Sequence, residues 1–237
     1  MKSLAICALF VLSFLLLRST VLPQTPTVDS VLAQMEKSNT SYPYIQAKIE
    51  TKTYTSFAKS FDDPKTGNVW ISRTGNAPRQ IRINYDKPVK EQLLIDKGKF
   101  TKYAPSIKMA TVFNFNKDDQ PEGECILLGL CQSSARIKQN YTISISTNQE
   151  TVSGVKTTVV ELVPKEGKRA ANIKSIRLWL DAAKGYPIQS RVYTPNGNYR
   201  NSTFTEISIS AKPFSASQFD LKIPKDADVQ TIKELKF

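Results

Sequence analysis

The feature that most restricts the fold of this chain is an alternation of apolar and polar residues that recurs along most of its length. In residues 45–52, Ile45, Ala47 and Ile49 alternate with glutamine, lysine and glutamate. A period of two is typical of a β-strand with one buried face and one face in water. Because short segments of this kind follow one another between turn residues, the sequence predicts an antiparallel meander.

The other predicted strands are short and closely spaced. They are expected near residues 65–73, 79–85, 91–96, 100–103, 108–115, 141–147, 157–164, 173–181, 188–194, 199–211 and 219–223. Asn196-Gly197 falls between two of these segments and is typical of a tight hairpin turn.

Two helical regions interrupt this pattern. An opening helix is expected over residues 28–37, ending before Tyr42, with Thr27 as its N-cap. Residues 121–139 contain an apolar run and predict one or two short helices inserted between strands. A sheet that curls around this insertion would leave a concave apolar face with the insertion as its cover. A filled β-sandwich core would show the same pattern, so the pattern leaves both a cavity and a filled core open.

The N-terminus has the pattern of a secretory signal. Lys2 precedes an apolar run from Leu4 to Leu17 that stops at Arg18 and is too short to span a bilayer comfortably. We expect residues 1–23 to be a signal peptide and residues 24–237 to form one exported domain. The cleavage site is poorly marked, and an uncleaved anchor is the alternative.

The composition argues against an enzyme. Histidine is absent, which removes Ser-His and Cys-His nucleophile pairs and nearly all zinc chemistry. Paired acids at Asp62-Asp63 and Asp118-Asp119 lie in turn-like polar sequence, where solvated loop carboxylates are expected. We therefore expect no catalytic residues, no metal and no cofactor.

The net charge of +12 has two interpretations. One is a solvated basic surface, and the other is attraction to anionic lipid headgroups or to an acidic partner. Nucleic acid is not expected as a partner, because the lysines and arginines are scattered singly along the alternating segments.

Cys125 and Cys131 are an even pair in an exported chain, which favours a disulfide in an oxidising compartment. Two buried thiols are the alternative. In one unbroken helix the two Cα atoms would be separated by about 9 Å of rise, beyond disulfide reach. A bridge therefore requires a break, for which Gly129 is the obvious place.

Several short motifs, taken in order and spacing, resemble the LolA family of periplasmic lipoprotein carriers. The first half has a glycine, an aromatic strand that ends in arginine, a Tyr-x-x-Pro turn and a glycine-bearing hairpin before Tyr-x-Pro. The second half has motifs similar to the closing hairpins of the family. The residues are Gly67–Arg73, Pro78, Arg82, Tyr85, Pro88, Lys97–Lys99, Tyr103–Pro105, Leu178–Asp181, Tyr186–Ile188, Asn196-Gly197, Phe204 and Phe219–Pro224.

This resemblance implies a mainly β fold with helices: an incomplete antiparallel β-barrel, or half-barrel, covered by an N-terminal helix and a helical lid. It implies a monomeric periplasmic carrier that binds the acyl chains of lipoproteins in a hydrophobic cavity. The expected partners are acylated lipoproteins as cargo, an inner-membrane lipoprotein-releasing ABC transporter and an outer-membrane acceptor.

Strand parity and the resemblance together give the candidate site. The expected acyl-chain cavity is lined by Val69, Ile71, Ile81, Ile83, Tyr85, Leu93 and Ile95. The expected lid residues are Ile126, Leu127, Leu128 and Leu130. The resemblance implies that Arg73 hydrogen-bonds the lid and holds the empty state closed; an exposed arginine at the end of a strand is the alternative. The cysteine pair departs from the usual family lid and puts the usual opening motion in doubt.

Two other roles would use the same fold. A periplasmic sensor or generic lipid-binding protein would bind an amphiphile and act through a partner. An outer-membrane acceptor should carry a lipid-modified cysteine at its mature start, and none follows Leu17.

Overall fold

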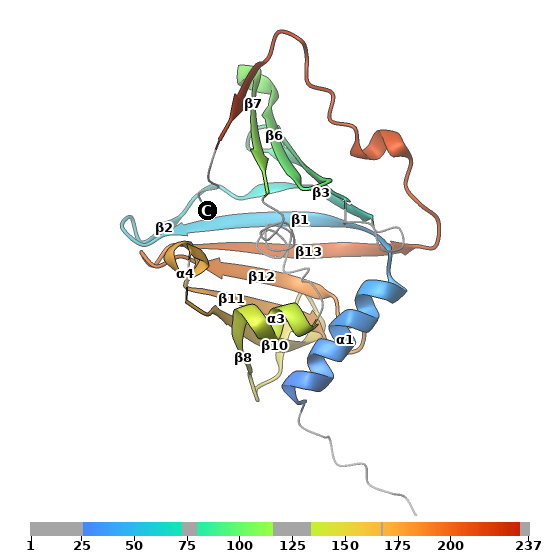
Figure 1. Cartoon of the computed structure of the whole chain (residues 1–237), viewed down its shortest axis with the longest axis vertical. Coiled ribbons are helices and arrows are strands. Elements are labelled where there is room, and N and C mark those ends of the chain that lie inside the picture. Colours follow the sequence, from blue (N-terminus) through green and yellow to red (C-terminus); the bar gives the residue numbers. More distant parts are fainter. Residues whose placement is uncertain (1–25, 73–79, 116–133, 167, 233–237) are drawn as a thin grey trace, which may run out of the picture.

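One large curved sheet dominates the computed structural model (Figure 1), which describes residues 26–72, 80–115, 134–166 and 168–232. Fourteen strands in these residues belong to this sheet. They are β1 (Tyr44–Thr55), β2 (Ser60–Phe61), β3 (Lys65–Ser72), β4 (Gln80–Lys87), β5 (Glu91–Asp96), β6 (Lys99–Ala104), β7 (Met109–Asn114), β8 (Tyr141–Ile145), β9 (Glu150–Val152), β10 (Val155–Pro164), β11 (Ser175–Asp181), β12 (Pro187–Tyr193), β13 (Tyr199–Ser210) and β14 (Asp228–Thr231).

The strand order confirms the predicted meander and shows how its two halves join. The order is β14-β7-β6-β5-β4-β3-β1-β13-β12-β11-β10-β8, with β2 on β1 and β9 on β10. In the centre, β1 pairs antiparallel with both β3 and β13, so that Ile49 lies between Gly67 and Phe204. Since β14 and β8 lie at opposite ends of the order, the sheet is open, as the half-barrel prediction requires.

The helices of the described residues are few and short beside the sheet. They are α1 (Val28–Ser41), α3 (Ser134–Asn140), α4 (Lys168–Asn172) and the 3-10 turns η1 (Pro105–Ile107) and η2 (Ala216–Phe219). The opening helix is confirmed and extends four residues beyond its predicted end. Thr27 Oγ1 accepts a hydrogen bond from the Ser30 backbone amide at 3.2 Å, and Ser30 Oγ accepts one from the Thr27 backbone amide at 3.0 Å. This reciprocal pair fixes the start of α1.

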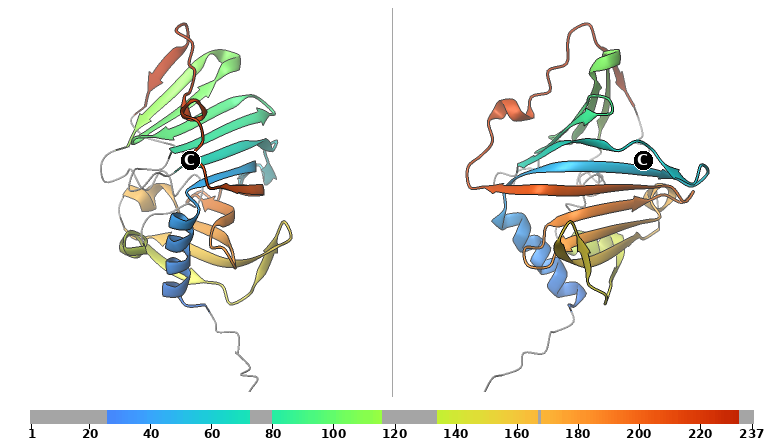
Figure 2. Two further views of the ribbon diagram at one scale, coloured as in Figure 1. Left: turned by 90° about the vertical axis from the view of Figure 1, so that its right-hand side faces the viewer. Right: turned by 180° about the vertical axis from the view of Figure 1, so that it is seen from behind.

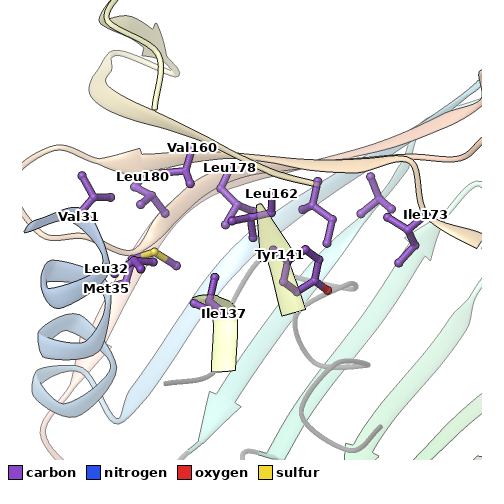
Figure 3. Packing of buried hydrophobic residues seen from close by; sticks show 12 residues of the cluster. Val31, Leu32, Met35, Ile137, Tyr141, Val160, Leu162, Ile173, Leu178 and Leu180 are labelled. Atoms are coloured by element: carbon purple, nitrogen blue, oxygen red, sulfur yellow. The ribbon is translucent and has the colours of Figure 1, made fainter. Parts of the chain in front are cut away.

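We call the sheet face that α1 and α3 cover the inner face. A first cluster of buried apolar residues lies there, between these helices and strands β10 to β12 (Figure 3). It comprises Val31, Leu32, Met35, Ile137, Tyr141, Val160, Leu162, Ile173, Ile176, Leu178, Leu180 and Val192. The apolar stripe predicted for the opening helix therefore packs on the sheet.

A second cluster lies on the same face, on strands β1, β3, β4, β5 and β13. Val192 of the first cluster pairs with Arg200, and Phe204 of the second cluster lies four residues further along β13. Alternate residues of a strand share a face, so the two clusters lie on one surface. The second cluster comprises Ile45, Ala47, Ile49, Val69, Ile71, Ile81, Ile83, Tyr85, Ile95, Phe100, Phe115 and Phe204.

The strand predicted at residues 219–223 is wrong. The chain forms η2 up to Phe219, and the next regular element is β14 at Asp228–Thr231, which pairs parallel with β7. Phe219 is buried and its ring lies 6.3 Å from that of Phe214. The apolar residue at this position thus reflects packing on the sheet and not strand pairing. Figure 2 shows the C-terminal segment running from β13, at mid-height, to β14 at the top of the molecule.

The β9–β10 hairpin was missed, although the sequence contains its signal. Its turn places Ser153 at φ 49° and Gly154 at φ 79°. Two successive positive φ values are typical of the two-residue hairpin turn, for which Ser-Gly is a suitable sequence. The Asn196-Gly197 turn between β12 and β13 is confirmed, with Gly197 at φ 84°.

Candidate functional site

The structure brings the predicted cavity residues together. Cross-strand pairing arranges them in two rows that run over β3, β4 and β5. One row joins Val69, Ile83 and Leu93, and the other joins Ile71, Ile81 and Ile95. Leu93 is half-buried and packs against the second cluster, whereas the other five and Tyr85 are buried members of it.

The apolar surface is wider than the predicted site. Ile45, Ala47 and Ile49 of β1 continue it, and Phe204 of β13 carries it to the other half of the sheet. The alternation in residues 45–52 already indicated a buried face for β1. Its adjacency to β13 could not be predicted, because more than 140 residues separate Ile49 from its partner Phe204.

A small cavity lies on this part of the inner face. It has a volume of about 20 Å³ and lies between β1, β3, β12 and β13. Its lining residues are Ile45, Ala47, Val69, Ile71, Tyr186, Pro187, Phe204 and Ile207. Such a volume is about that of one water molecule. Residues around this cavity would therefore have to move apart before an acyl chain could enter there.

One end of the inner face is polar. Thr51 Oγ1 lies 2.9 Å from the Tyr85 hydroxyl and 3.0 Å from Ser202 Oγ, and all three side chains are buried. Burial raises the pKa of Tyr85 above its ordinary value, and the hydrogen bond with Thr51 only partly opposes this. The hydroxyl groups therefore remain neutral and act as hydrogen-bond donors and acceptors.

A charged group adjoins these hydroxyls. Glu91, the cross-strand partner of Tyr85, accepts a hydrogen bond from Lys65 Nζ at 2.7 Å and forms an ion pair with Lys102 at 3.1 Å. Burial of Glu91 raises its pKa, but the two lysines outweigh this and hold the pKa below its ordinary value. The carboxylate thus stays ionised between two cations.

Arg200 also faces inward at this end, and sequence reasoning missed it. It pairs with Thr53 on β1 and with the buried Val192 on β12, which places it on the inner face. Burial lowers the pKa of Arg200, and the nearby Tyr85 opposes this shift. Parity with Phe204 in β13 was the signal that could have found this residue.

On the outer face, arginine side chains lie against aromatic rings and polar side chains. The Arg191 guanidinium lies 5.2 Å from the centre of the Trp179 ring and 4.9 Å from that of Tyr199. Arg82 also lies on this face, donates a 2.6 Å hydrogen bond from Nε to Asn84 Oδ1, and has a pKa lowered by burial and partly restored by Asp220. Cations on this side of the sheet are thus held by aromatic rings and polar neighbours.

Several predicted functional residues lie outside the described ranges. They are Arg73, Ile126, Leu127, Leu128, Leu130, Cys125 and Cys131. The latch, lid and disulfide therefore stay predictions. The described part of the insertion, α3 at Ser134–Asn140, confirms a helix at its C-terminal end.

Within the described ranges, no helix combines the length and the apolar character needed to cross a membrane. The side chains described there also include no group of three or more histidines, cysteines or acids placed to hold a metal ion.

The fold is similar to solved structures at low sequence identity. MucB matches with a TM-score of 0.54 and 14% identity over 86% of this chain, which covers 65% of the MucB chain, less than two thirds of it. An uncharacterized conserved protein from Thermus thermophilus matches with a TM-score of 0.54 and 11% identity over 87% of this chain and 100% of that one. These matches show the fold alone. A search among curated proteins gave no match.

The family model described as "Outer membrane lipoprotein carrier protein LolA" matches residues 53–222, which is more than half of the chain. This range extends from the last three residues of β1 to the segment after η2, and it includes strands β2 to β13. The order of motifs, the open sheet and this match agree, and the chain belongs to the LolA family.

Proposed function

We propose that this chain is a periplasmic carrier that binds the acyl chains of lipoproteins on its inner face and moves them from the inner to the outer membrane. The observation that carries the proposal is the continuous apolar surface formed by the two clusters on one face of an open sheet. In a sheet that does not close, the two end strands, β14 and β8, are not paired with each other, so the sheet can flex and change its curvature.

Apolar contact alone can supply the affinity. Burial of one methylene group contributes about 0.8 kcal/mol, so a long acyl chain needs no directed polar contact to bind. The small size of the cavity beside Phe204 and Ile207 opposes binding there, because the lining side chains must separate before an acyl chain can enter. A carrier benefits from this balance, since cargo that is held too tightly cannot be released.

The remaining parts of the proposal follow from the family. Residues 1–23 act as the signal peptide, and residues 24–237 form the mature, monomeric carrier domain. An inner-membrane ABC transporter loads it and an outer-membrane acceptor receives the cargo. The segment with Ile126, Leu127, Leu128 and Leu130 acts as the lid, and Arg73 as its latch.

The test is release of a lipoprotein from membranes. Purified mature protein is incubated with spheroplasts that produce a tagged lipoprotein, and the supernatant is examined for a soluble one-to-one complex. We expect a complex with the wild type. We expect Arg73→Leu to retain its cargo longer than the wild type, as a lost latch requires.

Two adjacent leucines provide a matched pair of variants. Leu93 lies on the inner face beside Ile83, whereas Leu94 pairs with Arg82 on the outer face, and both are half-buried. Leu93→Glu replaces an apolar side chain of the proposed binding surface by a hydrated carboxylate opposite Lys102 and should reduce complex formation at least about tenfold, because an acyl chain lying there would lose its apolar contact and would have to displace bound water. Leu94→Glu should bind as the wild type does.

Absence of any complex would contradict the carrier role. If a fluorescent fatty acid still bound to such a protein, the alternative role of a sensor or generic lipid-binding protein would replace it. Equal loss in Leu93→Glu and Leu94→Glu would contradict the assignment of the inner face.

A further inference from the structure

Large apolar side chains are exposed in turns at one edge of the sheet. Strands β1, β3, β4, β5 and β6 pair antiparallel in this order, so the C-terminal ends of β1, β4 and β6 lie at the same edge. Each of these ends leads into a turn with an exposed apolar residue. Phe57 is 98% exposed, Val89 is 51% exposed and Ile107 is 64% exposed. We call these three turns, residues 56–60, 88–90 and 105–108, the turn edge.

The common position of these residues is the informative observation, because a single exposed apolar residue is ordinary on a protein surface. Phe61 on β2 and Val163 at the end of β10 are also exposed near this edge. Apolar side chains that recur at separate points along one edge favour contact with an extended surface over insertion into a single pocket.

The turn that carries Phe57 is fixed by hydrogen bonds to a neighbouring hairpin. The Ser56 backbone amide donates to Asn198 Oδ1 at 2.9 Å, and Ser56 Oγ donates to the Asn196 carbonyl oxygen at 2.8 Å. Figures 1 and 2 show the β1–β2 hairpin projecting from one side of the molecule. Phe57 is therefore held in water by a structured, convex element, which suits a flat partner.

Aromatic rings lie behind this turn. Tyr54 stacks on Tyr199 with ring centres 4.9 Å apart, and the Phe61 ring lies 5.3 Å from that of Tyr54. Tyrosine rings are typical of the level at which a protein meets lipid headgroups, and phenylalanine is typical of side chains that enter the acyl boundary. The composition of this hairpin thus matches the interface of a bilayer.

The charge of the chain identifies the kind of bilayer. A lysine follows each exposed apolar residue within two positions; these are Lys59, Lys90 and Lys108. Acids offset them locally, since Lys108 pairs with Asp226 and the same turns or their flanks carry Asp62, Asp63 and Asp86. The attraction therefore comes from the chain as a whole.

Most of the net charge belongs to the expected mature chain. Residues 1–23 contain two basic residues, Lys2 and Arg18, and no acid, so two of the +12 charges lie there and +10 remain on residues 24–237. Such a charge attracts the chain to an anionic lipid surface.

We infer that the turn edge docks on an anionic phospholipid bilayer, with Phe57 as the main inserted residue and Val89 and Ile107 as further contacts. The polar end of the inner face, at Thr51 and Tyr85, lies toward the same edge. An acyl chain that left the inner face there would meet the membrane directly. The inference deepens the proposed function and rests on it for its purpose, because a carrier must meet a membrane to exchange cargo.

The experiment is sedimentation of the purified mature protein with lipid vesicles. One set of vesicles contains equal parts of phosphatidylcholine and phosphatidylglycerol, and the other contains phosphatidylcholine alone. We expect the wild type to bind the anionic vesicles more tightly, and added salt should reduce the difference between the two sets.

Variants assign the binding to the turn edge. Phe57→Ser should lower the partition coefficient at least about tenfold, because burial of a phenylalanine ring is lost. The control is Ile209→Ser, which removes a 37% exposed apolar side chain from the opposite edge, where Ile209 pairs with Ile45 near the start of β1. This variant should bind as the wild type does.

Insertion can be observed directly with Phe57→Trp. This variant should bind vesicles as the wild type does and should gain fluorescence that brominated phosphatidylcholine quenches. The wild type gives the baseline, because its two tryptophans, Trp70 and Trp179, lie within strands β3 and β11.

The outcomes separate this inference from the proposed function. A wild type that bound a fluorescent fatty acid but no vesicles would overturn the docking edge and leave acyl binding intact. Equal binding by Phe57→Ser and Ile209→Ser would also overturn it. If Phe57→Ser bound vesicles normally but failed to release lipoprotein from spheroplasts, the edge would contact a protein instead. Binding of neither fatty acid nor vesicles would contradict both proposals.

Discussion

At the scale of single residues, Gly67 shows how closely two strands approach in the centre of the molecule. A Cβ atom at this position would lie 1.9 Å from the backbone carbonyl oxygen of Asn84 on the neighbouring strand. The pairing of β3 with β4 shifts register between Thr66 and Gly67. Because the obstacle is backbone, it cannot turn aside as a side chain could.

Gly67→Ala is therefore expected to destabilise the protein by about 3 kcal/mol, the upper range for overpacking. Gly154→Ala is the control, since Gly154 has φ 79° and nothing within 4 Å of the added atom. It should cost about 1 kcal/mol, the cost of a left-handed backbone conformation. Urea unfolding measures both, and equal losses would contradict the close approach at Gly67.

Tyr141 gives a prediction for alkaline pH. Burial raises the pKa of Tyr141 to about 12, above the value of about 10 in the unfolded chain. The folded state thus holds this proton more tightly than the unfolded state. Its contribution to stability is complete below pH 10 and is lost as the pH rises from about 10 to 12.

Urea unfolding of the wild type at pH 8 and pH 11 should show this loss. Because pH 11 lies one unit above the unfolded pKa and one unit below the folded one, about 1.4 kcal/mol of this contribution should be lost there. Tyr141→Phe removes the titrating hydroxyl and should lose less stability over the same interval. The lysines titrate in both proteins, so they cancel in the comparison. An identical pH dependence would show that Tyr141 is not protected from ionisation.

The sequence predicted the buried apolar residues of the inner face, but it did not predict the polar residues at one end of that face. A period of two places Ile81, Ile83 and Ile95 on one face whatever the strand order is, and hydrophobicity identifies that face as the buried one. The same parity places Arg200 on this face. Charged residues are usually exposed, however, so the alternation alone does not predict an inward-facing arginine. The polar end depends on side-chain contacts between residues of six strands, β1, β3, β4, β5, β6 and β13.

At the scale of elements, the same contrast separates α1 from β14. The helix combines an N-cap, a capping partner at Ser30 and a buried apolar stripe, and each of these can be read locally. By contrast, the four residues of β14 are all exposed, and the strand is held by backbone pairing with β7. A strand without a buried face has no alternation, so it leaves no signal in the sequence.

Because β14 has no buried side chains, we expect it to open locally more readily than the buried strands of the sheet. Hydrogen exchange followed by mass spectrometry should show β14 opening at about 1–2 kcal/mol, far below the global free energy of unfolding. Strand β11 lies between β10 and β12, and Leu178 and Leu180 are buried in the first cluster. Its amides should exchange only with global unfolding. Protection of β14 equal to that of β11 would show that the C-terminal segment is part of the cooperative core.

At the scale of the whole molecule, the arrangement depends on β1. This strand joins the meander β3 to β7 to the meander β10 to β13 (Figure 1). Both apolar clusters therefore lie on one continuous inner face. The sequence predicted the antiparallel class and the local hairpins. The pairing of β1 with β13 could not be predicted, because alternation identifies strands but does not show which distant strand lies beside each one.

The central claim is that acyl chains bind on the inner face of this open sheet. The most direct measurement is labelling with a photoreactive long-chain fatty acid, followed by mass spectrometric mapping of the modified residues. Cross-links should fall on inward residues of the second cluster, such as Ile83, and on Leu93 beside it, and an excess of unlabelled fatty acid should suppress them. Labelling of outward residues such as Leu94 to the same extent, or no labelling that competitor can suppress, would contradict the claim.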